Sequence, residues 1–332
     1  MEKALAIQKE VQRILGTEEV YLVGGSVRDL VMKNTPKDYD FTTSLLPEEM
    51  VEKVKTAGRR VYTIGEKFGT IGFKVPIGAE LELDLNGQDL DSEDFDANKV
   101  KAGRRTELFE YVEVTTFRSE VYTNKSRKPE VKFVPSLDED LARRDFTMNA
   151  MVLRSDGSIY DPFGGKLDIY AKQIKTVGQP KDRIMEDPLR ILRAARFAAR
   201  YGFKIDPNFI GKARQLADRI FDVSVERWVQ ELDKLLTSSY PDSGLYALKD
   251  MGILMRILPE LYNDNNEIYV GEDDFDQNPD MAWKKLLECM VLPQNITERS
   301  RTKRFISAGI CARFKFSNDR TDFILDKHKQ KG

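Results

Sequence analysis

A glycine pair followed by two closely spaced acids could support metal-assisted chemistry on a phosphate. Gly24 and Gly25 end the apolar run 20–23, and Asp38 and Asp40 come shortly afterwards. Glycines between a strand and a helix let the backbone approach a ligand, and the helix start offers free N–H groups to a phosphate. Two carboxylates on one strand face need a cation between them, and Mg²⁺ prefers oxygen ligands shared with substrate phosphates. Either motif alone is an ordinary turn or loop, but together they predict phosphoryl transfer.

A third carboxylate is expected to face the same metal ions from a neighbouring strand. Glu113 stands between β-branched residues in the predicted strand 112–117, where an acid is costly unless it has a ligand or a partner. Asp84 lies between two leucines in the same way, so the third acid could be either residue.

Basic residues in two places could bind the phosphates of a nucleotide. Arg28 lies one turn into the helix predicted after the glycine pair. Arg143, Arg144 and Asp145 are predicted to open an apolar helix. These three charges could be a cluster without function, or they could bind triphosphate and ribose, with Asp145 accepting a hydrogen bond from a 2′-hydroxyl.

Three further arginines are spaced by three along the segment 183–201, which is predicted to be one helix. They are Arg190, Arg193 and Arg196, and the positions between them are largely apolar. This pattern implies burial nearly all round the helix, and buried arginines require anions. A nucleotide triphosphate would supply those anions.

Asp187 and Arg190 lie one turn apart and could read the edge of a nucleobase. A carboxylate accepts from an exocyclic amine, and a guanidinium donates to a ring nitrogen or oxygen. Cytosine and adenine carry such an amine where uracil and guanine carry a carbonyl, so the pair predicts selection of C and A. Asp187 followed by Pro188 is also an ordinary helix start, which is the structural alternative.

The elements that must position these residues change in type along the chain. Short strands are expected at 20–23, 38–43, 70–75, 81–85, 112–117 and 131–134, with helices at 27–32 and from Pro47 to Gly58. Beyond about Leu153 the pattern is helical, at 183–201, 225–236 and 245–254, with two more helices between 282 and 329. The sequence therefore predicts an α/β head followed by an all-helical remainder.

Composition excludes several chemistries. The single histidine, His328, nearly excludes serine–histidine triads and histidine-ligated metals. Two cysteines, Cys289 and Cys311, make neither a disulfide framework nor a zinc cage, which favours a reducing cytoplasm. No apolar run reaches the ~18–20 residues that span a bilayer, so no membrane association is expected. The formal net charge of −2 argues against a general nucleic-acid coat, although the end of the chain from Glu298 is basic.

In combination, these motifs resemble the class II tRNA nucleotidyltransferase and poly(A) polymerase family. The Gly-Gly and Asp-x-Asp part is similar to the polymerase-beta-type nucleotidyltransferase superfamily. The resemblance runs from about residue 20 to residue 236. It includes 161–165, which looks like the family's hinge, and 226–232, which looks like its last motif.

The resemblance implies an α+β fold in three parts and a defined activity. A nucleotidyltransferase head with a small mixed sheet is expected at 1–153, a helical neck for base recognition at 154–258, and a short helical body and tail for tRNA contact at 259–332. The implied activity is template-independent addition of C and A to the 3′ end of tRNA (CCA addition) by two-metal nucleotidyl transfer from CTP and ATP, with release of pyrophosphate. The resemblance assigns Mg²⁺ to Asp38 and Asp40, the nucleotide to Gly25, Arg28, Arg144, Arg193 and Arg196, and the role of an amino-acid template to Asp187 and Arg190.

Three rival functions stay open at this point. The chain could be a poly(A) polymerase, an enzyme that adds only CC or only A, or an inactive RNA-binding relative. Residues 224–232 look more like the tRNA enzymes, and 118–129 resemble the flexible loop of enzymes that add the final A. The segment 80–111 is longer, and the region after Leu261 shorter, than the family pattern predicts. The oligomeric state is not predicted.

Overall fold

The chain forms two compact units in a computed structural model. The described residues are 1–63, 68–84, 101–121, 130–262, 268, 277–288, 307 and 309–325, with the backbone alone at 78–84, 101–107, 120–121 and 130–131. The first unit comprises Met1–Arg144 and Asn149–Gly165, and the second comprises Asp145–Met148 and Lys166–Gly332. Among the described helices, none is long and apolar enough to cross a membrane.

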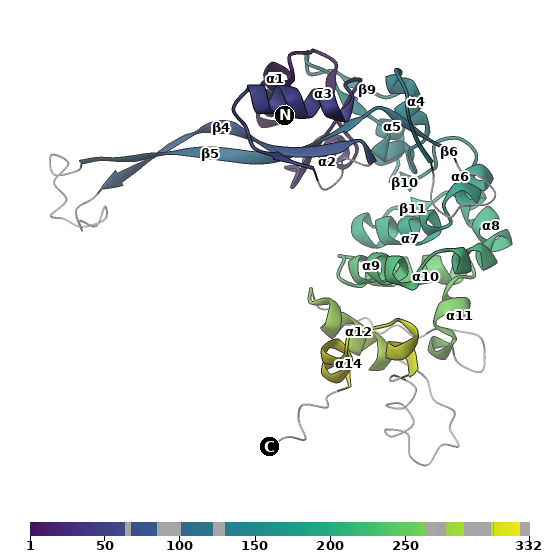
Figure 1. Ribbon diagram of the computed structural model, residues 1–332. Helices are drawn as coiled ribbons and strands as arrows, with labels where there is room; N and C mark the ends of the chain where they lie inside the picture. The colour runs from purple at the N-terminus through teal and green to yellow at the C-terminus, as the bar shows by residue number, and fades with distance from the viewer. Residues whose placement is uncertain are drawn as a thin grey trace, which may run out of the picture. The chain divides into compact units, whose positions relative to one another are not determined.

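A mixed sheet of seven strands is the framework of the first unit (Figure 1). Its strands are β1 (Val20–Val23), β2 (Tyr39–Thr43), β3 (Val61–Tyr62), β4 (Thr70–Asp84), β5 (Lys101–Thr116), β8 (Val152–Leu153) and β9 (Ile159–Tyr160). They lie in the order β3-β4-β5-β2-β1-β8-β9. Strands β2 and β5 run parallel, and the other described pairs of this sheet are antiparallel. The predicted α/β head is therefore confirmed as a small mixed sheet.

The described helices of the first unit are α1 (Glu2–Leu15), α2 (Gly25–Val31), α3 (Pro47–Thr56) and α4 (Leu137–Ala142). Helix α1 packs against β1 and β4 through buried side chains such as Ile7 and Val11. Its buried Gln8 amide donates from Nε2 to the carbonyl oxygens of Val20 and Leu153, at 3.1 and 3.2 Å, and these bonds tie α1 to β1 and β8. The helix predicted from Pro47 is confirmed as α3, which ends just before Gly58.

The described parts of the segment 80–111, residues 80–84 and 101–111, belong to two long paired strands, and residues 85–100 lie outside the described residues. Strands β4 and β5 pair from Thr70↔Thr115 out to Asp84↔Lys101, and they extend together beyond the rest of the sheet in Figure 1. The two strands predicted at 70–75 and 81–85 are thus one strand as far as Asp84, and Leu85 lies outside the described residues. A register shift between Pro76 and Gly78 accounts for the apparent break, because proline cannot donate to the ladder.

A second, two-stranded sheet lies at the segment predicted to be a flexible loop. Strands β6 (Arg118–Val121) and β7 (Glu130–Phe133) pair antiparallel, and residues 122–129 lie outside the described residues. Arg143 and Arg144 follow the end of α4, so the expectation that they open an apolar helix is wrong. The apolar residues after them, Phe146, Met148, Ala150 and Met151, are buried in and around a short turn, η3 (Thr147–Asn149), which precedes β8.

The second unit is mostly helical. Its elements are α5 (Gly165–Tyr170), α6 (Pro180–Glu186), α7 (Leu189–Tyr201), α8 (Pro207–Gln215), η4 (Ala217–Asp222), α9 (Val225–Leu236), α10 (Pro241–Asp250), α11 (Leu254–Ile257), η5 (Pro259–Leu261), α12 (Pro279–Glu288) and α14 (Asn318–Ile324). Strands β10 (Gln173–Ile174) and β11 (Lys204–Ile205) pair in parallel, so the expectation of an all-helical remainder is wrong in this detail. Residues 154–165 lie with the first unit, because β9 pairs with β8.

The helix predicted at 183–201 is interrupted at Asp187 and Pro188. Proline lacks an N–H and disfavours helical backbone in the residue before it, and Asp187 accordingly has an extended backbone (φ −141°, ψ 103°). The helix predicted at 245–254 is similarly divided into α10 and α11, with Gly252 at φ 71° between them.

Helix α7 is the central helix of the second unit and packs against α9 and α10. The close approach of α10 requires Gly244, because a Cβ there would lie 2.8 Å from the Cβ of Ala199 and 3.0 Å from the carbonyl oxygen of Ala195. This packing explains why α7 is buried nearly all round, as its sequence predicts.

Candidate active site

The glycine turn after β1 lies directly beside an arginine. Gly24 has φ 72° and ψ −128°, a conformation that side chains rarely adopt. A Cβ at this position would lie only 3.2 Å from Nη1 of Arg144. The turn therefore needs glycine for its backbone angles and for its contact with Arg144, which comes from a segment more than 100 residues later in the chain.

A buried serine fixes the backbone that carries the two acids. Ser26 donates from Oγ to the carbonyl oxygen of Asp38 at 2.9 Å and accepts from the N–H of Asp40 at 3.4 Å. Asp40 belongs to β2, whereas Asp38 precedes its first residue, so the prediction that both acids lie within the strand is wrong. The hydroxyl of Ser26 links α2 to the acid pair, a role that the sequence pattern did not indicate.

Glu113 lies beside Asp40 on the neighbouring strand. The two residues are register partners in the parallel pair β2–β5, and both side chains are exposed while their strand neighbours are buried. Asp40 keeps contact with solvent, but the surrounding protein reduces its hydration, and the carboxylates of Glu113 and Asp38 add repulsion. Together these effects raise the pKa of Asp40 from 3.8 to about 6, although Arg144 acts in the opposite direction.

Asp84 does not share this position. It pairs with Lys101 at the far end of the β4–β5 pair, whereas Gly72 is the β4 residue opposite Glu113. Twelve residues of strand separate Gly72 from Asp84, which corresponds to roughly 35–40 Å. The backbone therefore brings Glu113, and not Asp84, to the acid pair.

The acids have the donor chemistry that a hard divalent cation requires. Crowded carboxylates that raise one another's pKa are relieved by a bound cation, and their oxygens suit Mg²⁺. Among the residues that the structure describes, no group of three or more His, Cys, Asp and Glu side chains is arranged to hold a metal ion. Asp38 and Asp40 fit the predicted metal pair, and a third ligand stays a prediction.

The side chain of Arg28 lies inside the first unit and contacts other residues of the chain. This side chain is buried, with Nη1 donating to Asn149 at 2.7 Å, and Nε and Nη2 donating to Asp29 at 3.1 and 2.9 Å. A Cβ on Gly25 would lie 3.3 Å from its Nη2. These contacts fix the helix that follows the turn, and the expected phosphate contact of Arg28 stays a prediction.

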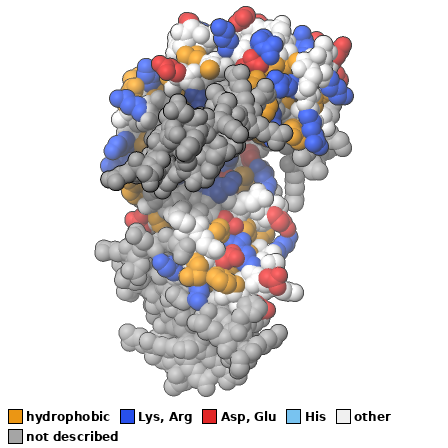
Figure 2. All heavy atoms as spheres, turned by 90° about the vertical axis from the view of Figure 1, so that its left-hand side faces the viewer, with side chains coloured by type: hydrophobic (Ala, Val, Ile, Leu, Met, Phe, Trp, Pro, Cys, Tyr) orange, Lys and Arg blue, Asp and Glu red, His pale blue; other side chains and the backbone are white. Residues whose placement is uncertain are grey.

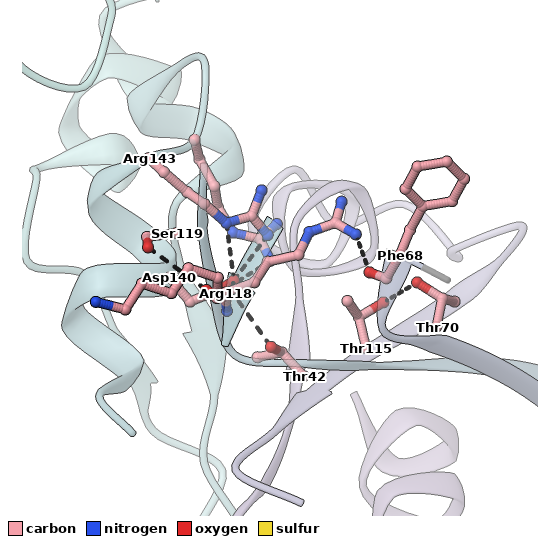
Figure 3. A network of polar contacts seen from close by, with 10 residues as sticks. Thr42, Phe68, Thr70, Thr115, Arg118, Ser119, Asp140 and Arg143 are labelled. Atoms are coloured by element: carbon pink, nitrogen blue, oxygen red, sulfur yellow. Dashed lines mark hydrogen bonds and ion pairs between the residues drawn. The ribbon is translucent and has the colours of Figure 1, made fainter. Parts of the chain in front are cut away.

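The arginine pair at 143–144 is organised by one buried carboxylate (Figure 3). Asp140 Oδ1 accepts from Nε and Nη2 of Arg143 at 3.1 and 2.7 Å, and Oδ2 accepts from Nη2 of Arg144 at 2.9 Å. Asp140 also accepts from the backbone N–H of Arg118 at 3.3 Å and from the hydroxyl of Thr42 at 3.5 Å. The sequence analysis did not single out Asp140.

In the second unit, carboxylates of the chain itself pair with the three arginines of α7. Arg190 binds Glu186 at 2.5 Å, Arg193 binds Asp145 through Nε at 2.7 Å, and Arg196 binds Glu231 at 2.6 Å. The inference that a triphosphate must supply the anions for these residues is therefore wrong. Glu186 lies only four residues before Arg190, so helical spacing could have indicated that pair. The partners of Arg193 and Arg196 lie 48 and 35 residues away and are specified only by the fold.

Two acids, Asp145 and Asp187, were predicted to contact the nucleotide and have partners within the chain. Asp145 accepts from the N–H of Phe146 at 2.8 Å as well as from Arg193, and this carboxylate raises the pKa of Arg193. Asp187 accepts from the N–H of Leu189 at 3.1 Å and from Nη2 of Arg227 at 2.8 Å. Asp187 thus makes the hydrogen bond to the helix start that its structural alternative predicts, while one side of it faces an exposed arginine.

Charged side chains are dispersed over the described surface that Figure 2 displays. Lys and Arg side chains lie at several places on this face of the first unit, interspersed with acidic and hydrophobic ones. This distribution agrees with the net charge of −2, and it assigns no nucleic-acid contact to that face.

Comparisons with known proteins identify the family. Residues 20–85 and 78–175 match the "Poly A polymerase head domain" family, and residues 202–264 match "Probable RNA and SrmB- binding site of polymerase A". The chain belongs to the Poly A polymerase head domain family. Members of this nucleotidyltransferase family generally use divalent metal ions, in agreement with the acid pair.

Several similar proteins are named CCA-adding enzymes. The chain is 38% identical over 251 residues to the CCA-adding enzyme of Bacillus subtilis (strain 168), which covers 75% of this chain and 54% of the relative. It is 34% identical over 311 residues to the CCA-adding enzyme of Streptococcus agalactiae serotype V, which covers 92% of this chain and 66% of the relative. The chain thus spans about half to two thirds of the length of these relatives.

A solved structure has the same fold over nearly the whole chain. The crystal structure of the Bacillus stearothermophilus CCA-adding enzyme in complex with CTP matches with a TM-score of 0.65 and 28% identity. The match covers 97% of this chain and 67% of that one. The predicted α+β fold, with a mixed head sheet followed by a mostly helical region, is therefore confirmed.

Proposed function

We propose that this chain adds C and A nucleotides to the 3′ end of tRNA without a nucleic-acid template, using CTP and ATP and releasing pyrophosphate. One observation carries the proposal: Asp38, Asp40 and Glu113 converge beside Gly24 and Arg144 in the head of a chain whose relatives are named CCA-adding enzymes. The CTP complex of the Bacillus stearothermophilus structure supports the choice of nucleotide.

The reaction requires a nucleophile, a leaving group and stabilisation of phosphate charge. The oxygen of the tRNA 3′-hydroxyl forms a bond to the α-phosphorus, the bond from that phosphorus to the pyrophosphate oxygen breaks, and the hydroxyl proton is released. Mg²⁺ held by Asp38 and Asp40 would lower the pKa of the hydroxyl and neutralise charge on the phosphates. Arg144, beside the glycine turn, would bind the phosphates, and Glu113 would complete the acidic site.

Base selection would fall to Asp187 and Arg190, with Arg193 and Arg196 supporting them. A carboxylate has about four lone-pair sites, so Asp187 can accept from a base amine while it binds Leu189 and Arg227. The pairs Arg193–Asp145 and Arg196–Glu231 would hold α7 and α9 in place around the reading residues. The carboxylate of Asp145 would accept a ribose 2′-hydroxyl only by sharing its oxygen with Arg193.

The proposal also covers where the protein acts and how it differs from the rival functions. We place the protein in the cytoplasm, because its two cysteines make no disulfide framework. A poly(A) polymerase, or an enzyme restricted to CC or A, would use the same acids on a different acceptor or stop early. An inactive RNA-binding relative would have little use for an acid cluster in which the pKa of Asp40 is raised to about 6.

The product on a shortened tRNA tests the proposal. A tRNA that ends at position 73 is incubated with Mg²⁺ and each nucleotide alone, then with CTP and ATP mixed, and products are read at single-nucleotide resolution. The expected result is two additions from CTP alone and C-C-A from the mixture. A long A tract, an arrest after CC, addition of A only to a CC end, or no extension would each replace the proposal by one of its rivals.

A further inference from the structure

One carboxylate of the first unit is completely buried and bonded on every side. Asp140 lies in α4 with 0% of its surface exposed, and it accepts hydrogen bonds from Arg143, Arg144, Thr42 and the backbone of Arg118. Figure 3 shows Thr42 of β2, Arg118 at the start of β6 and Arg143 just after α4 around Asp140. Burial alone would raise the pKa of Asp140, but the guanidiniums of Arg144 and Arg143 outweigh it and hold the pKa below its ordinary value.

The two oxygens of Asp140 serve different arginines. Arg143 binds Oδ1 through both Nε and Nη2, which fixes the plane of the carboxylate. Oδ2 is then left to receive Nη2 of Arg144 at 2.9 Å. The position of the Arg144 guanidinium is consequently set by a side chain whose own orientation is fixed.

A second nitrogen of Arg144 lies over the candidate site. Nη1 would be 3.2 Å from a Cβ on Gly24, so it lies over the glycine turn. Nε of Arg144 is buried and has no hydrogen-bond partner among the described residues. A guanidinium with Nη2 anchored and Nη1 at a glycine turn is suited to binding a phosphate oxygen.

We infer that Asp140 is a positioning residue that holds the Arg144 guanidinium over the Gly24–Gly25 turn, so that nucleotide affinity depends on a buried carboxylate that does not touch the nucleotide. The inference rests on the proposed function, because it takes Arg144 as a ligand of the nucleotide phosphates. A neutral amide at position 140 offers one acceptor oxygen instead of two and no charge. It can no longer hold both arginines, and the Arg144 guanidinium is released from its place.

Direct measurement of nucleotide affinity tests this role. Calorimetric titration of the full chain with CTP and Mg²⁺ gives the Kd of wild type, Asp140→Asn, Arg144→Ala and the double variant, below the lowest melting temperature of the set. We expect Asp140→Asn to weaken CTP binding by about 10–100-fold, the range for loss of a charged hydrogen bond. On the Arg144→Ala background, Asp140→Asn should weaken CTP binding by less than about twofold, because the two substitutions remove the same interaction.

A matched control separates positioning from general damage. Asp168 is also a buried carboxylate, bonded to Thr147 at 2.7 Å and to Lys175 at 2.8 Å within the second unit. Asp168→Asn should leave the Kd for CTP within about twofold of wild type while lowering thermal stability, as expected for loss of a buried charged contact. If Asp140→Asn does not fold, Asp140→Glu decides, since it keeps the charge but displaces the carboxylate by one methylene.

The outcomes are distinguishable from failure of the proposed function. Wild-type affinity in a folded Asp140→Asn or Asp140→Glu variant, or equal losses with and without Arg144, would overturn the inference alone. A wild-type chain that binds neither CTP nor ATP would overturn the proposed function, and the inference with it. A large loss of CTP affinity when Arg144 is present, with little loss on the Arg144→Ala background, supports the positioning role.

Discussion

At the scale of single residues, the acids of the head are held in an arrangement that costs stability. Asp40 faces Glu113 and Asp38, and its pKa rises to about 6 although part of it is in contact with solvent. Such crowding is common where a protein binds a cation or performs chemistry. The sequence predicted Asp40 on a strand, because strand periodicity is local information, but it wrongly included Asp38, which precedes β2. It could not predict Ser26 as the group that fixes their backbone, since a hydroxyl bond across twelve residues depends on the fold.

The choice of the third acid is a prediction at this scale. Glu113→Ala should reduce nucleotidyl transfer nearly as much as loss of Asp40, because Glu113 is the register partner of Asp40. Asp84→Ala should have a mild effect, since its backbone lies at the far end of the β4–β5 pair. Single-turnover rates of the two variants decide the matter. A larger loss in Asp84→Ala than in Glu113→Ala would assign the third carboxylate to Asp84 instead.

Base choice is a second prediction for one residue. A uracil carbonyl facing Asp187 leaves an acceptor unpaired, at a cost of roughly 1–3 kcal/mol, or about 5–150-fold in selectivity. In Asp187→Ala, use of UTP and GTP should therefore rise relative to CTP and ATP while the total rate falls. The variant should also lose ~1 kcal/mol of stability, because Asp187 accepts from the N–H of Leu189.

The measurement for Asp187→Ala is kcat/KM for all four nucleotides beside a denaturation curve. Asp222→Ala is a suitable control, because Asp222 is an exposed acid that pairs with Arg219 in the same unit. If the variant is less stable but its nucleotide ratios equal those of wild type and the control, Asp187 serves the helix start only, and selectivity has another source.

At the scale of helices and strands, buried ion pairs connect the elements that carry the predicted nucleotide residues. Arg196 of α7 and Glu231 of α9 are both buried and bind each other at 2.6 Å. Glu231→Gln should destabilise the chain by about 3–5 kcal/mol, because it leaves Arg196 buried without its counter-charge. Chemical denaturation measures this loss. Asp218→Asn, which breaks an exposed pair with Arg256, should change stability by less than about 0.5 kcal/mol, and an equal loss in both variants would contradict the argument.

Helix α4 supplies a prediction on pH. Because the folded-state pKa of Asp140 lies below its ordinary value, the ionised side chain stabilises the fold above pH ~4, and this contribution is lost as pH falls through the folded-state pKa. The stability gap between wild type and Asp140→Asn should thus be widest near pH 7 and shrink below pH ~4. Denaturation curves from pH 7 to pH 3 measure the gap, and a gap that is constant over this range would contradict the ionised state of Asp140.

Helices and strands were predictable from the sequence where hydrophobic periodicity and helix-start residues specify them. They were not predictable where contacts between distant residues specify them. The strand at 20–23, the helix from Pro47 and the helix at 225–236 follow from periodicity and helix-start residues, and all three are present. Pro188 was interpreted as part of a helix start, but its effect on the backbone of Asp187 also ends α6. The long pairing of β4 with β5 and the pairs Arg193–Asp145 and Arg196–Glu231 join residues well separated in sequence, which no local pattern specifies.

At the scale of the whole molecule, the residues predicted to carry out nucleotidyl transfer and those predicted to select the base belong to different units. The first holds the acids, the glycine turn and Arg144, and the second holds Asp187 and the arginines of α7. Residues 144 and 145 are chain neighbours that belong to different units, so the two sets of residues are directly connected along the backbone. The division of residues 154–332 into neck, body and tail stays a prediction, as does the manner in which tRNA is bound.

The most direct test of the proposed activity is C-C-A addition by Asp40→Asn beside the wild-type chain. Both proteins are incubated with tRNA ending at position 73, CTP, ATP and Mg²⁺, and initial rates are measured on samples with unchanged melting curves. Asp156→Asn, an exposed acid of the same unit that lies at a turn before β9, serves as the control. We predict C-C-A products from wild type and control, and a loss of about 10³-fold or more in Asp40→Asn, as expected when a metal ligand of a phosphoryl-transfer site is removed. A folded Asp40→Asn variant that adds C-C-A within tenfold of the wild-type rate would contradict the assignment of the acid pair as the site of transfer.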